Sequence, residues 1–217
     1  MKSILVIGCG RFGRHLAKQM QELGNEVMIV DKDEDLIEEL SSQFTDALCG
    51  DCTNEKVLRS LGVNDFDICF VAIGDDFQSS LVVTSLLKSM HAKLIVSKAK
   101  RDIQAYLLKQ IGADEVVYPE KDIAEKLAVR YNSSNIFDYF ELSQEYSIYE
   151  IAIPKEWIGK TVLDLDVRKN YKVNIIAIKQ NNNVLPMPFT HYKFQEKDHI
   201  VVIGKSTDVF RLSPSGD

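Results

Sequence analysis

The sequence predicts an α/β protein, with a Rossmann-type parallel-sheet domain followed by a small α+β domain. Up to residue 118, short β-branched runs alternate with segments whose apolar residues recur every three or four positions. Apolar strands that alternate with helices are typical of a parallel sheet covered on both faces. A glycine-rich turn, Gly8-Cys9-Gly10-Arg11-Phe12-Gly13, follows the first apolar run directly. In α/β proteins such a turn holds the phosphates of a nucleotide.

The first part of the chain is expected to contain strands and helices in strict alternation. Asp33 and Asn54 have the residue type of N-caps, and Gly24, Gly62 and Gly112 stand just past predicted helix ends. The predicted strands are 3–7, 26–31, 45–49, 67–73, 93–97 and 115–118. The predicted helices are 11–23, 33–42, 54–61, 76–90 and 101–111.

At Tyr118-Pro119 the alternation stops. Residues 119–140 are expected to form a helix–turn–helix element, with its turn at Asn132-Ser133-Ser134-Asn135. Its aromatic content exceeds that of an exposed connector, so it either covers the domain edge or packs against a partner subunit. The remaining segment, 141–217, is expected to form the small α+β domain, and 1–118 the Rossmann-type domain. Within the small α+β domain we predict strands at 147–153, 173–178 and 199–204, a short helix at 162–169 and a turn at Asn181-Asn182-Asn183.

Composition excludes several classes of function. The net charge of −6 argues against a nucleic-acid binder, which normally has a basic face. No apolar run approaches the roughly 18 residues of a membrane span, and no secretory signal is evident, so the cytoplasm is the expected location. Cys49 and Cys52 have C-x-x-C spacing. No second such motif and no suitably spaced histidine accompanies them, which favours small residues at a strand end over a redox or metal site.

Polar groups at three further strand ends support a nucleotide site. Asp31 ends the second strand, where a carboxylate accepts hydrogen bonds from ribose hydroxyls. Gly50-Asp51-Cys52-Thr53 follows the third strand, where an adenine ring can rest, and Ala72-Ile73-Gly74-Asp75-Asp76 follows the fourth, at the topological switch point. The alternative is that the glycines serve only close packing of helix against strand.

Arg11 bears on the identity of the nucleotide. A cation in the first turn opposes the positive end of the helix dipole, unless anionic charge docks there. A guanidinium can hold a terminal phosphate at two points. This favours ATP or ADP over a dinucleotide, although an arginine that only points into water stays the alternative.

Taken together, the ordered motifs resemble the RCK (KTN) regulatory subunits, of the KtrA/TrkA type, of bacterial potassium uptake systems. The resemblance covers essentially the whole chain. It is carried by the glycine turn and Asp31, by 50–53, 71–74, Lys98, 111–114 and 119–122, and by 163–168 and 174–178 in the second domain. Each motif is common, but the set in this order is specific.

The resemblance implies an RCK_N domain, a helical crossover used in dimerisation and an RCK_C domain. Similar proteins are cytoplasmic, peripheral at the inner face of the cell membrane, and not enzymes. Their dimers assemble into an octameric ring beneath a membrane-embedded KtrB/TrkH-like potassium-translocating subunit. ATP or ADP changes the shape of the ring, which opens or closes the pore; NAD(H) is a further possible ligand of the same site.

The resemblance also implies individual roles. Arg11 matches an arginine that contacts the γ-phosphate, Asp31 the ribose carboxylate, Asp51 a residue beside adenine, and Lys98 a basic residue near the phosphates. Glu120 matches a carboxylate that helps to bind a divalent cation (Mg or Ca) with ATP; without the resemblance, an exposed first-turn glutamate explains it equally well. The nucleotide-binding residues expected in all are Gly8, Gly10, Arg11, Phe12, Gly13, Asp31, Lys32, Asp51, Cys52, Ala72, Ile73, Gly74 and Lys98.

In the second domain the resemblance points to cyclic di-AMP. Some relatives bind it between two subunits at positions matched by Arg168, Asn174, Ile175 and Pro188. An arginine and an apolar floor at Ile175, Ile176 and Ile178 suit phosphate and stacked purines; a surface arginine beside core isoleucines is the alternative. Three features depart from the family pattern, namely Cys9, Arg14 and Pro186-Met187-Pro188.

Two other functions compete with a gating subunit. One is a small NAD(P)-dependent oxidoreductase, which the sequence supports poorly. It has no Tyr-x-x-x-Lys pair, and the segment after residue 140 has no dense cluster of acids and bases. The other is a freestanding cyclic-dinucleotide sensor without a membrane partner.

Overall fold

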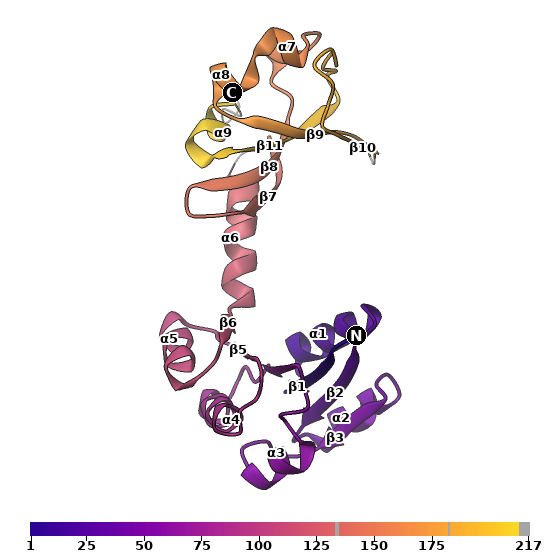
Figure 1. Cartoon of the computed structure of the whole chain (residues 1–217), viewed down its shortest axis with the longest axis vertical. Helices are drawn as coiled ribbons and strands as arrows, with labels where there is room; N and C mark the ends of the chain where they lie inside the picture. Colours follow the sequence, from indigo (N-terminus) through magenta and orange to yellow (C-terminus); the bar gives the residue numbers. More distant parts are fainter. Residues whose placement is uncertain (133–134, 182, 213–217) are drawn as a thin grey trace. The chain divides into compact units, whose positions relative to one another are not determined.

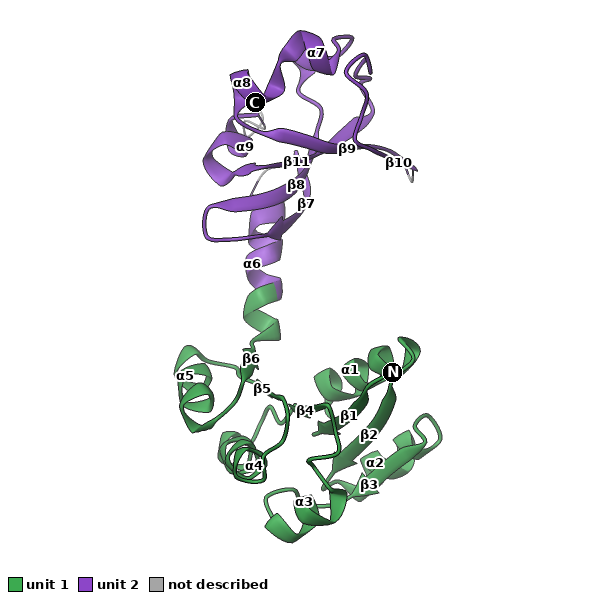
Figure 2. Cartoon of the chain, in the orientation of Figure 1, with its two compact units in different colours: residues 1–122 green, residues 123–217 purple. Residues whose placement is uncertain are grey.

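The structure is a computed structural model that describes residues 1–132, 135–181 and 183–212 (Figure 1). The chain divides into two compact units, Met1–Asp122 and Ile123–Asp217 (Figure 2). The turns predicted around Ser133-Ser134 and at Asn182 lie outside the described residues.

Unit 1 is built on a six-stranded, wholly parallel sheet in the order β3-β2-β1-β4-β5-β6. The predicted Rossmann-type fold is confirmed, and each predicted strand and helix of this part is present. The strands are β1 (Ser3–Ile7), β2 (Glu26–Asp31), β3 (Asp46–Cys49), β4 (Ile68–Val71), β5 (Ile95–Lys98) and β6 (Glu115–Val117). The helices are α1 (Arg11–Glu22), α2 (Glu34–Ser41), α3 (Glu55–Leu61), α4 (Phe77–Ser89) and α5 (Asp102–Ile111).

Helices cover both faces of this sheet. Successive strand residues point to opposite sides, so a continuous apolar strand presents apolar side chains to both faces. In β1, Ile4 and Val6 pack with residues of α1 and α2, whereas Leu5 and Ile7 pack with residues of α3 and α4. The predicted caps are also present: the Asp33 side chain accepts a hydrogen bond from the Leu36 amide at the start of α2. Gly62 ends α3 with φ 64°, a left-handed conformation that favours glycine.

Unit 2 contains a five-stranded antiparallel sheet in the order β10-β9-β11-β8-β7. Its strands are β7 (Ile136–Glu141), β8 (Tyr146–Ala152), β9 (Asn174–Gln180), β10 (Asn183–Pro186) and β11 (Asp198–Lys205). Its helices are η1 (Lys155–Trp157), α7 (Val162–Leu165), α8 (Val167–Tyr171) and α9 (Ser206–Leu212). α6 (Pro119–Tyr131) begins in unit 1 and continues into unit 2. The predicted small α+β domain is confirmed.

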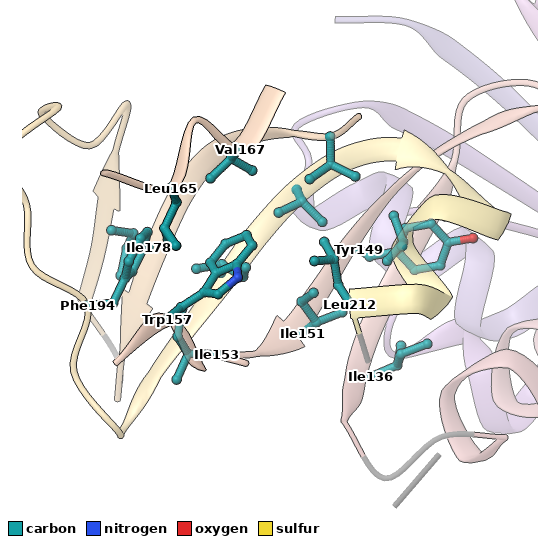
Figure 3. Packing of buried hydrophobic residues seen from close by; sticks show 14 residues of the cluster. Ile136, Tyr149, Ile151, Ile153, Trp157, Leu165, Val167, Ile178, Phe194 and Leu212 are labelled. Atoms are coloured by element: carbon teal, nitrogen blue, oxygen red, sulfur yellow. The ribbon is translucent and has the colours of Figure 1, made fainter. Parts of the chain in front are cut away.

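The core of unit 2 gathers around Trp157, which is fully buried (Figure 3). Its ring lies against Tyr171 and Phe194, with centroids 4.9 and 5.7 Å away. Alternate residues of β8 and β11 complete the core, among them Ile151 and Ile200. This separate hydrophobic cluster explains why residues 123–217 form a compact unit of their own.

The second helix predicted within 119–140 is wrong. Residues Ile136–Glu141 form strand β7, which pairs with β8 so that Tyr139 lies opposite Tyr149. Ile136, Phe137 and Phe140 have a spacing that a helix also shows, but the run Ile-Phe-Asp-Tyr-Phe is rich in residues that favour strands. Burial of Ile136 against Ile151 decides the conformation, and this contact is not visible in local spacing.

The single helix predicted at 162–169 is instead two short helices. Asp166 separates α7 from α8 with φ 41°, a left-handed conformation. The Thr161 hydroxyl and the Asp164 carboxylate form a reciprocal capping box at the start of α7. This break places Leu165 and Val167, on either side of Asp166, in the same core.

Candidate nucleotide-binding site

A pocket of about 320 Å³ opens at the carboxyl ends of the strands of unit 1. It lies around β1, β2 and β4, where the strand order reverses between β1 and β4. Open α/β sheets bind ligands at this switch point. The pocket is lined by Ile7, Gly8, Gly10, Val30, Asp31, Lys32, Asp33, Leu36, Gly50, Asp51, Cys52, Thr53, Ala72, Ile73, Gly74, Asp75, Asp76, Ser79 and Val83.

The glycine turn brings backbone very close to backbone. A Cβ on Gly13 would lie 1.9 Å from the carbonyl oxygen of Gly8, so this position tolerates glycine alone. Gly10 precedes α1, and a Cβ there would meet nothing within 4 Å. No acidic side chain stands in the first turn of α1. The amides of this turn have no acceptor within the helix, so the turn suits an anion.

Asp31 closes the end of β2 toward the glycine turn. One of its carboxylate oxygens accepts a 2.6 Å hydrogen bond from the Cys9 amide. The other accepts a 3.1 Å hydrogen bond from the Asp33 amide. These bonds fix the carboxylate in the pocket wall while leaving acceptor capacity for the hydroxyls of a ribose.

Two further carboxylates are held by their own loops. The Asp51 carboxylate accepts hydrogen bonds from the hydroxyl and the amide of Thr53, at 2.7 and 2.9 Å, which lower its pKa. Asp76 caps α4 through the hydroxyl and amide of Ser79, and these bonds lower its pKa too. Both groups are therefore anionic at neutral pH, and this end of the pocket attracts hydrogen-bond donors such as amino and hydroxyl groups.

Cations stand beside the glycine turn, at the end of the pocket that we call the phosphate end because of its predicted role. Lys98, only 9% exposed, donates a 2.8 Å hydrogen bond to the Glu120 carboxylate, and its Nζ lies 5.2 Å from the centre of the Phe12 ring. This bond lowers the pKa of Glu120. Arg11 is exposed at the start of α1. Carboxylates thus line the pocket wall, and the cations Arg11 and Lys98 flank the pocket beside the glycine turn.

The structure brings nine of the thirteen predicted nucleotide-binding residues into the pocket wall: Gly8, Gly10, Asp31, Lys32, Asp51, Cys52, Ala72, Ile73 and Gly74. The other four surround the phosphate end without lining the pocket. Gly13 is buried behind Gly8, Phe12 lies beneath Lys98, and Arg11 stands at the helix start. The binding roles of all thirteen residues stay predictions.

Sequence reasoning missed several wall residues. Leu36 and Ser79 lie in the first turns of α2 and α4, just past their N-caps Asp33 and Asp76. The caps were a usable signal, since a helix that starts at the carboxyl edge of the sheet presents its first turn to the pocket. Val30 and Val83 line the pocket although both are fully buried, which no local pattern indicates.

The four cysteine thiols differ in burial. Cys9, Cys52 and Cys69 are buried, and burial raises the pKa of each to about 12, whereas Cys49 is exposed. A thiol with so high a pKa is neutral and unreactive. In addition, the described residues contain no group of three or more His, Cys, Asp or Glu side chains that could hold a metal ion. Glu120 alone therefore does not make a cation site within one chain.

A second pocket, of about 430 Å³, lies in unit 2. It is lined by Val162, Leu163, Asp166, Val167, Arg168, Val173, Asn174, Ile175, Pro188 and Thr190. All four residues predicted for cyclic di-AMP belong to this wall. Arg168 Nε donates a 2.7 Å hydrogen bond to the Asn174 side-chain oxygen, which orients the guanidinium. Of the predicted apolar floor, only Ile175 lines the pocket, because Ile178 is buried in the core and Ile176 faces away, 37% exposed.

The sheet order, the glycine turn and the carboxylate at the end of β2 together define a protein with a Rossmann domain of the nucleotide-binding type, followed by a small α+β unit. Comparison with protein-family models agrees with both parts: a TrkA-N domain matches residues 4–119, and a TrkA-C domain matches residues 147–213. The chain belongs to the TrkA-N/TrkA-C family, which confirms the resemblance to KtrA/TrkA-type RCK proteins.

Individual relatives match over nearly the full chain. Ktr system potassium uptake protein C of Bacillus subtilis (strain 168) is 41% identical over 211 residues, covering 97% of this chain and 96% of that protein. Ktr system potassium uptake protein A of the same strain is 35% identical, covering 99% and 97%. A solved GsuK channel bound to NAD matches with a TM-score of 0.72 at 18% identity, covering all of this chain and 40% of the channel chain. At that identity the match shows likeness of fold.

Proposed function

We propose that this chain is a nucleotide-responsive regulatory subunit that gates a membrane-embedded potassium transporter and is not itself an enzyme. The two relatives named above are potassium uptake proteins that match from end to end. The observation that carries the nucleotide part is the pocket of unit 1, with carboxylates in its wall and Lys98 beside its glycine turn.

The pocket's charges favour particular nucleotides. Asp31 and Asp33 both line the pocket, and we place the ribose beside them, so a 2′-phosphate would meet two carboxylates. ATP, ADP and NAD(H) carry no such group, whereas NADP does. Arg11 and Lys98 add positive charge beyond the glycine turn, which favours the terminal phosphates of ATP over the internal pyrophosphate of NAD. ATP and ADP are therefore the proposed ligands, with NAD(H) as the competitor.

The proposed mechanism is linkage between ligand and shape. A ligand shifts a conformational equilibrium only by its difference in affinity for the two states. Lys98 joins the phosphate end to Glu120, in the first turn of α6. ATP, with a divalent cation held by its phosphates and Glu120, would favour the active arrangement, and ADP would release it. Further cation ligands would have to come from outside the single chain.

α6 supplies a surface for assembly. Ile123, Leu127 and Tyr131 are 54%, 42% and 76% exposed, and their four-residue spacing puts them on one side of the helix. An apolar stripe of this kind normally lies in an interface. We assign it to a homodimer that builds an octameric ring at the cytoplasmic face of a KtrB/TrkH-like subunit. No described helix is long and apolar enough to span a membrane.

Titration of the purified chain with ATP, ADP, NAD and NADH tests the ligand, and native mass measurement with ATP and with ADP reports ring size. Tight binding of ATP and ADP, with different affinities, is the expected result. Absent or equal binding of the two would overturn the gating mechanism. Oxidation of NADH by the pure protein would instead support the hypothesis that the chain is an oxidoreductase.

The pocket of unit 2 favours a second ligand, cyclic di-AMP, because all four predicted residues share its wall. The Arg168 guanidinium suits a phosphate, and Ile175 and Pro188 offer apolar surface for a purine. Titration of wild type, Arg168→Ala and Lys169→Ala tests this site. Lys169 is the neighbouring cation outside the pocket wall, so its variant should bind normally. A wild-type chain that does not bind cyclic di-AMP would remove this second function.

A further inference from the structure

We propose that Lys100 is an additional phosphate-binding residue of the nucleotide pocket, and that Asp75 is the internal carboxylate which an incoming phosphate displaces from it. The inference rests on the proposed nucleotide function and goes beyond it. It assigns specificity for terminal phosphates to a pair of residues that are not among the thirteen predicted nucleotide-binding residues.

The topology brings the two residues together. Asp75 follows β4 and Lys100 follows β5, and these strands are neighbours in the parallel sheet. Their loops therefore leave the same edge of the sheet, beside the pocket. Lys100 Nζ lies 2.5 Å from Asp75 Oδ1. Asp75 itself lines the pocket.

The backbone of Lys100 is held in place from two sides. Its amide donates a 2.9 Å hydrogen bond to the side-chain oxygen of Gln104, and its carbonyl accepts a hydrogen bond from the Tyr118 hydroxyl. The root of the side chain is therefore fixed, and the ammonium group can exchange partners without movement of the loop.

The Lys100 ammonium group is also aimed at the phosphate end. A Cβ placed on Gly74 would lie 3.5 Å from Lys100 Nζ and 3.8 Å from Lys98 Nζ, so both lysines converge on this glycine of the pocket wall. Two ammonium groups so close repel each other unless anions lie between them. In this structure Glu120 neutralises Lys98, and Asp75 neutralises Lys100.

Among the described residues, Asp75 has its ion pair with Lys100. The hydrogen bond from Lys100 and the charge of Lys100 lower its pKa most, and the charges of Lys98 and Arg11 lower it further. Its side chain is fully exposed, and Lys100 is 40% exposed. An ion pair this exposed contributes little to stability. A phosphate, with more charge and three acceptor oxygens, can replace the carboxylate at small cost.

This arrangement predicts opposite effects for the two residues. On this proposal Lys100 contacts the phosphates beyond the first, so in Lys100→Gln the affinity for ATP should fall about tenfold while the affinity for AMP changes less than twofold. Asp75→Asn removes the competing anion, so affinity for ATP should rise roughly three- to tenfold. In the double variant the gain from Asp75→Asn should shrink, because Lys100 is no longer there to be released.

Calorimetric titration of full-length protein with ATP and AMP tests the proposal, with Lys93→Gln as the control. Lys93 pairs with Asp67 at 3.1 Å, and these residues precede β5 and β4, at the opposite edge of the sheet. Its variant should bind ATP and AMP as wild type does, and Lys100→Arg should retain most of the ATP affinity.

Equal losses for ATP and AMP in Lys100→Gln, or weaker ATP binding by Asp75→Asn, would overturn the inference. In either case wild-type binding of ATP would leave the proposed function intact. A wild-type chain that binds neither nucleotide would overturn both. Thermal unfolding of each variant shows whether lost binding reflects lost folding.

Discussion

The Lys98 ammonium group donates a 2.8 Å hydrogen bond to the Glu120 carboxylate and so joins the end of β5 to the first turn of α6. The lysine is 9% exposed and the glutamate 57%. Lys98 is thus fixed by its surroundings, whereas Glu120 is free to change partners. A phosphate that binds Lys98 competes with Glu120. Binding in the pocket therefore changes the contacts of the first turn of α6.

The first prediction concerns this pair. Lys98→Gln should weaken ATP binding at least tenfold, since hydrogen bonds to charged groups contribute about 1.5–3 kcal/mol. Glu120→Gln, in the absence of divalent cations, should bind ATP at least as tightly as wild type, because Lys98 is then released from its carboxylate. Calorimetric titration in EDTA measures both variants. Weaker ATP binding by Glu120→Gln under these conditions would contradict the competition.

The second prediction uses two glycines of the same turn. Gly13→Ala should destabilise unit 1 by roughly 1–3 kcal/mol or more, because the new Cβ would meet the carbonyl oxygen of Gly8 at 1.9 Å. Gly10→Ala should leave stability nearly unchanged, since a Cβ there meets nothing within 4 Å. Differential scanning calorimetry compares the two. If Gly10→Ala binds nucleotide poorly while remaining stable, its Cβ occupies space that the ligand needs.

Much of unit 1 could be predicted because its signals are local. Strand β2 ends in Asp31, and α2 starts at the cap Asp33 only two residues later. Parallel strands all present their carboxyl ends to one edge, so naming the residues after each strand already gathers most of the pocket. The pocket-wall residues of unit 1 that the sequence did not predict depend on long-range packing. Val83 is an example, because its place in the wall follows from how α4 lies on the sheet.

Unit 2 was less predictable because its strands pair at long range. β7 has no local feature that separates it from a helix, and its conformation is set by pairing with β8. The short strand β10 consists of exposed residues and was likewise not predicted. By contrast, the strands predicted at 147–153 and 199–204 are present as β8 and β11, in each of which every second residue is buried. The first was predicted from its alternation of apolar and polar residues.

The third prediction tests the pairing of β7 with β8. Ile151→Ala should destabilise unit 2 by about 2–5 kcal/mol, because the fully buried Ile151 packs in the core and lies opposite Ile136. Trp157 is the chain's one tryptophan and is buried in this unit, so its fluorescence reports the unfolding of unit 2. Urea titration gives the change. Val184→Ala, on an exposed side chain, is the control and should shift the midpoint little.

The fourth prediction is a pH dependence that arises from Glu150. Burial alone would raise the pKa of this carboxyl, but 2.8 Å hydrogen bonds from Lys179 and His199 outweigh it and lower the pKa. A lowered pKa in the folded state stabilises unit 2 above the ordinary glutamate value of about 4.3, and the contribution is lost as pH falls through the lowered value.

Glu150→Gln should accordingly be less stable than wild type at pH 7, by roughly 1.5–3 kcal/mol. The difference should narrow below about pH 4, where the wild-type carboxylate takes up its proton. Urea unfolding followed by Trp157 fluorescence at pH 7, 5, 4 and 3 measures this difference, and Glu156→Gln, at an exposed residue of η1, serves as control. A constant difference at all four values would show that Glu150 acts through packing instead of charge.

The fifth prediction concerns thiol reactivity beside the pocket. Only Cys49 is exposed; burial raises the pKa of the other three thiols to about 12, and a thiolate is the reactive form. Native protein at pH 8 should therefore release one equivalent of thionitrobenzoate rapidly from Ellman's reagent, and Cys49→Ser should abolish this phase. Cys52 also lines the pocket, but its thiol is buried, so Cys52→Ser should leave the fast phase unchanged. Rapid reaction of two or more thiols would mean that the strand ends around the pocket open readily. The pocket would then not be the preformed site that the proposed nucleotide binding requires.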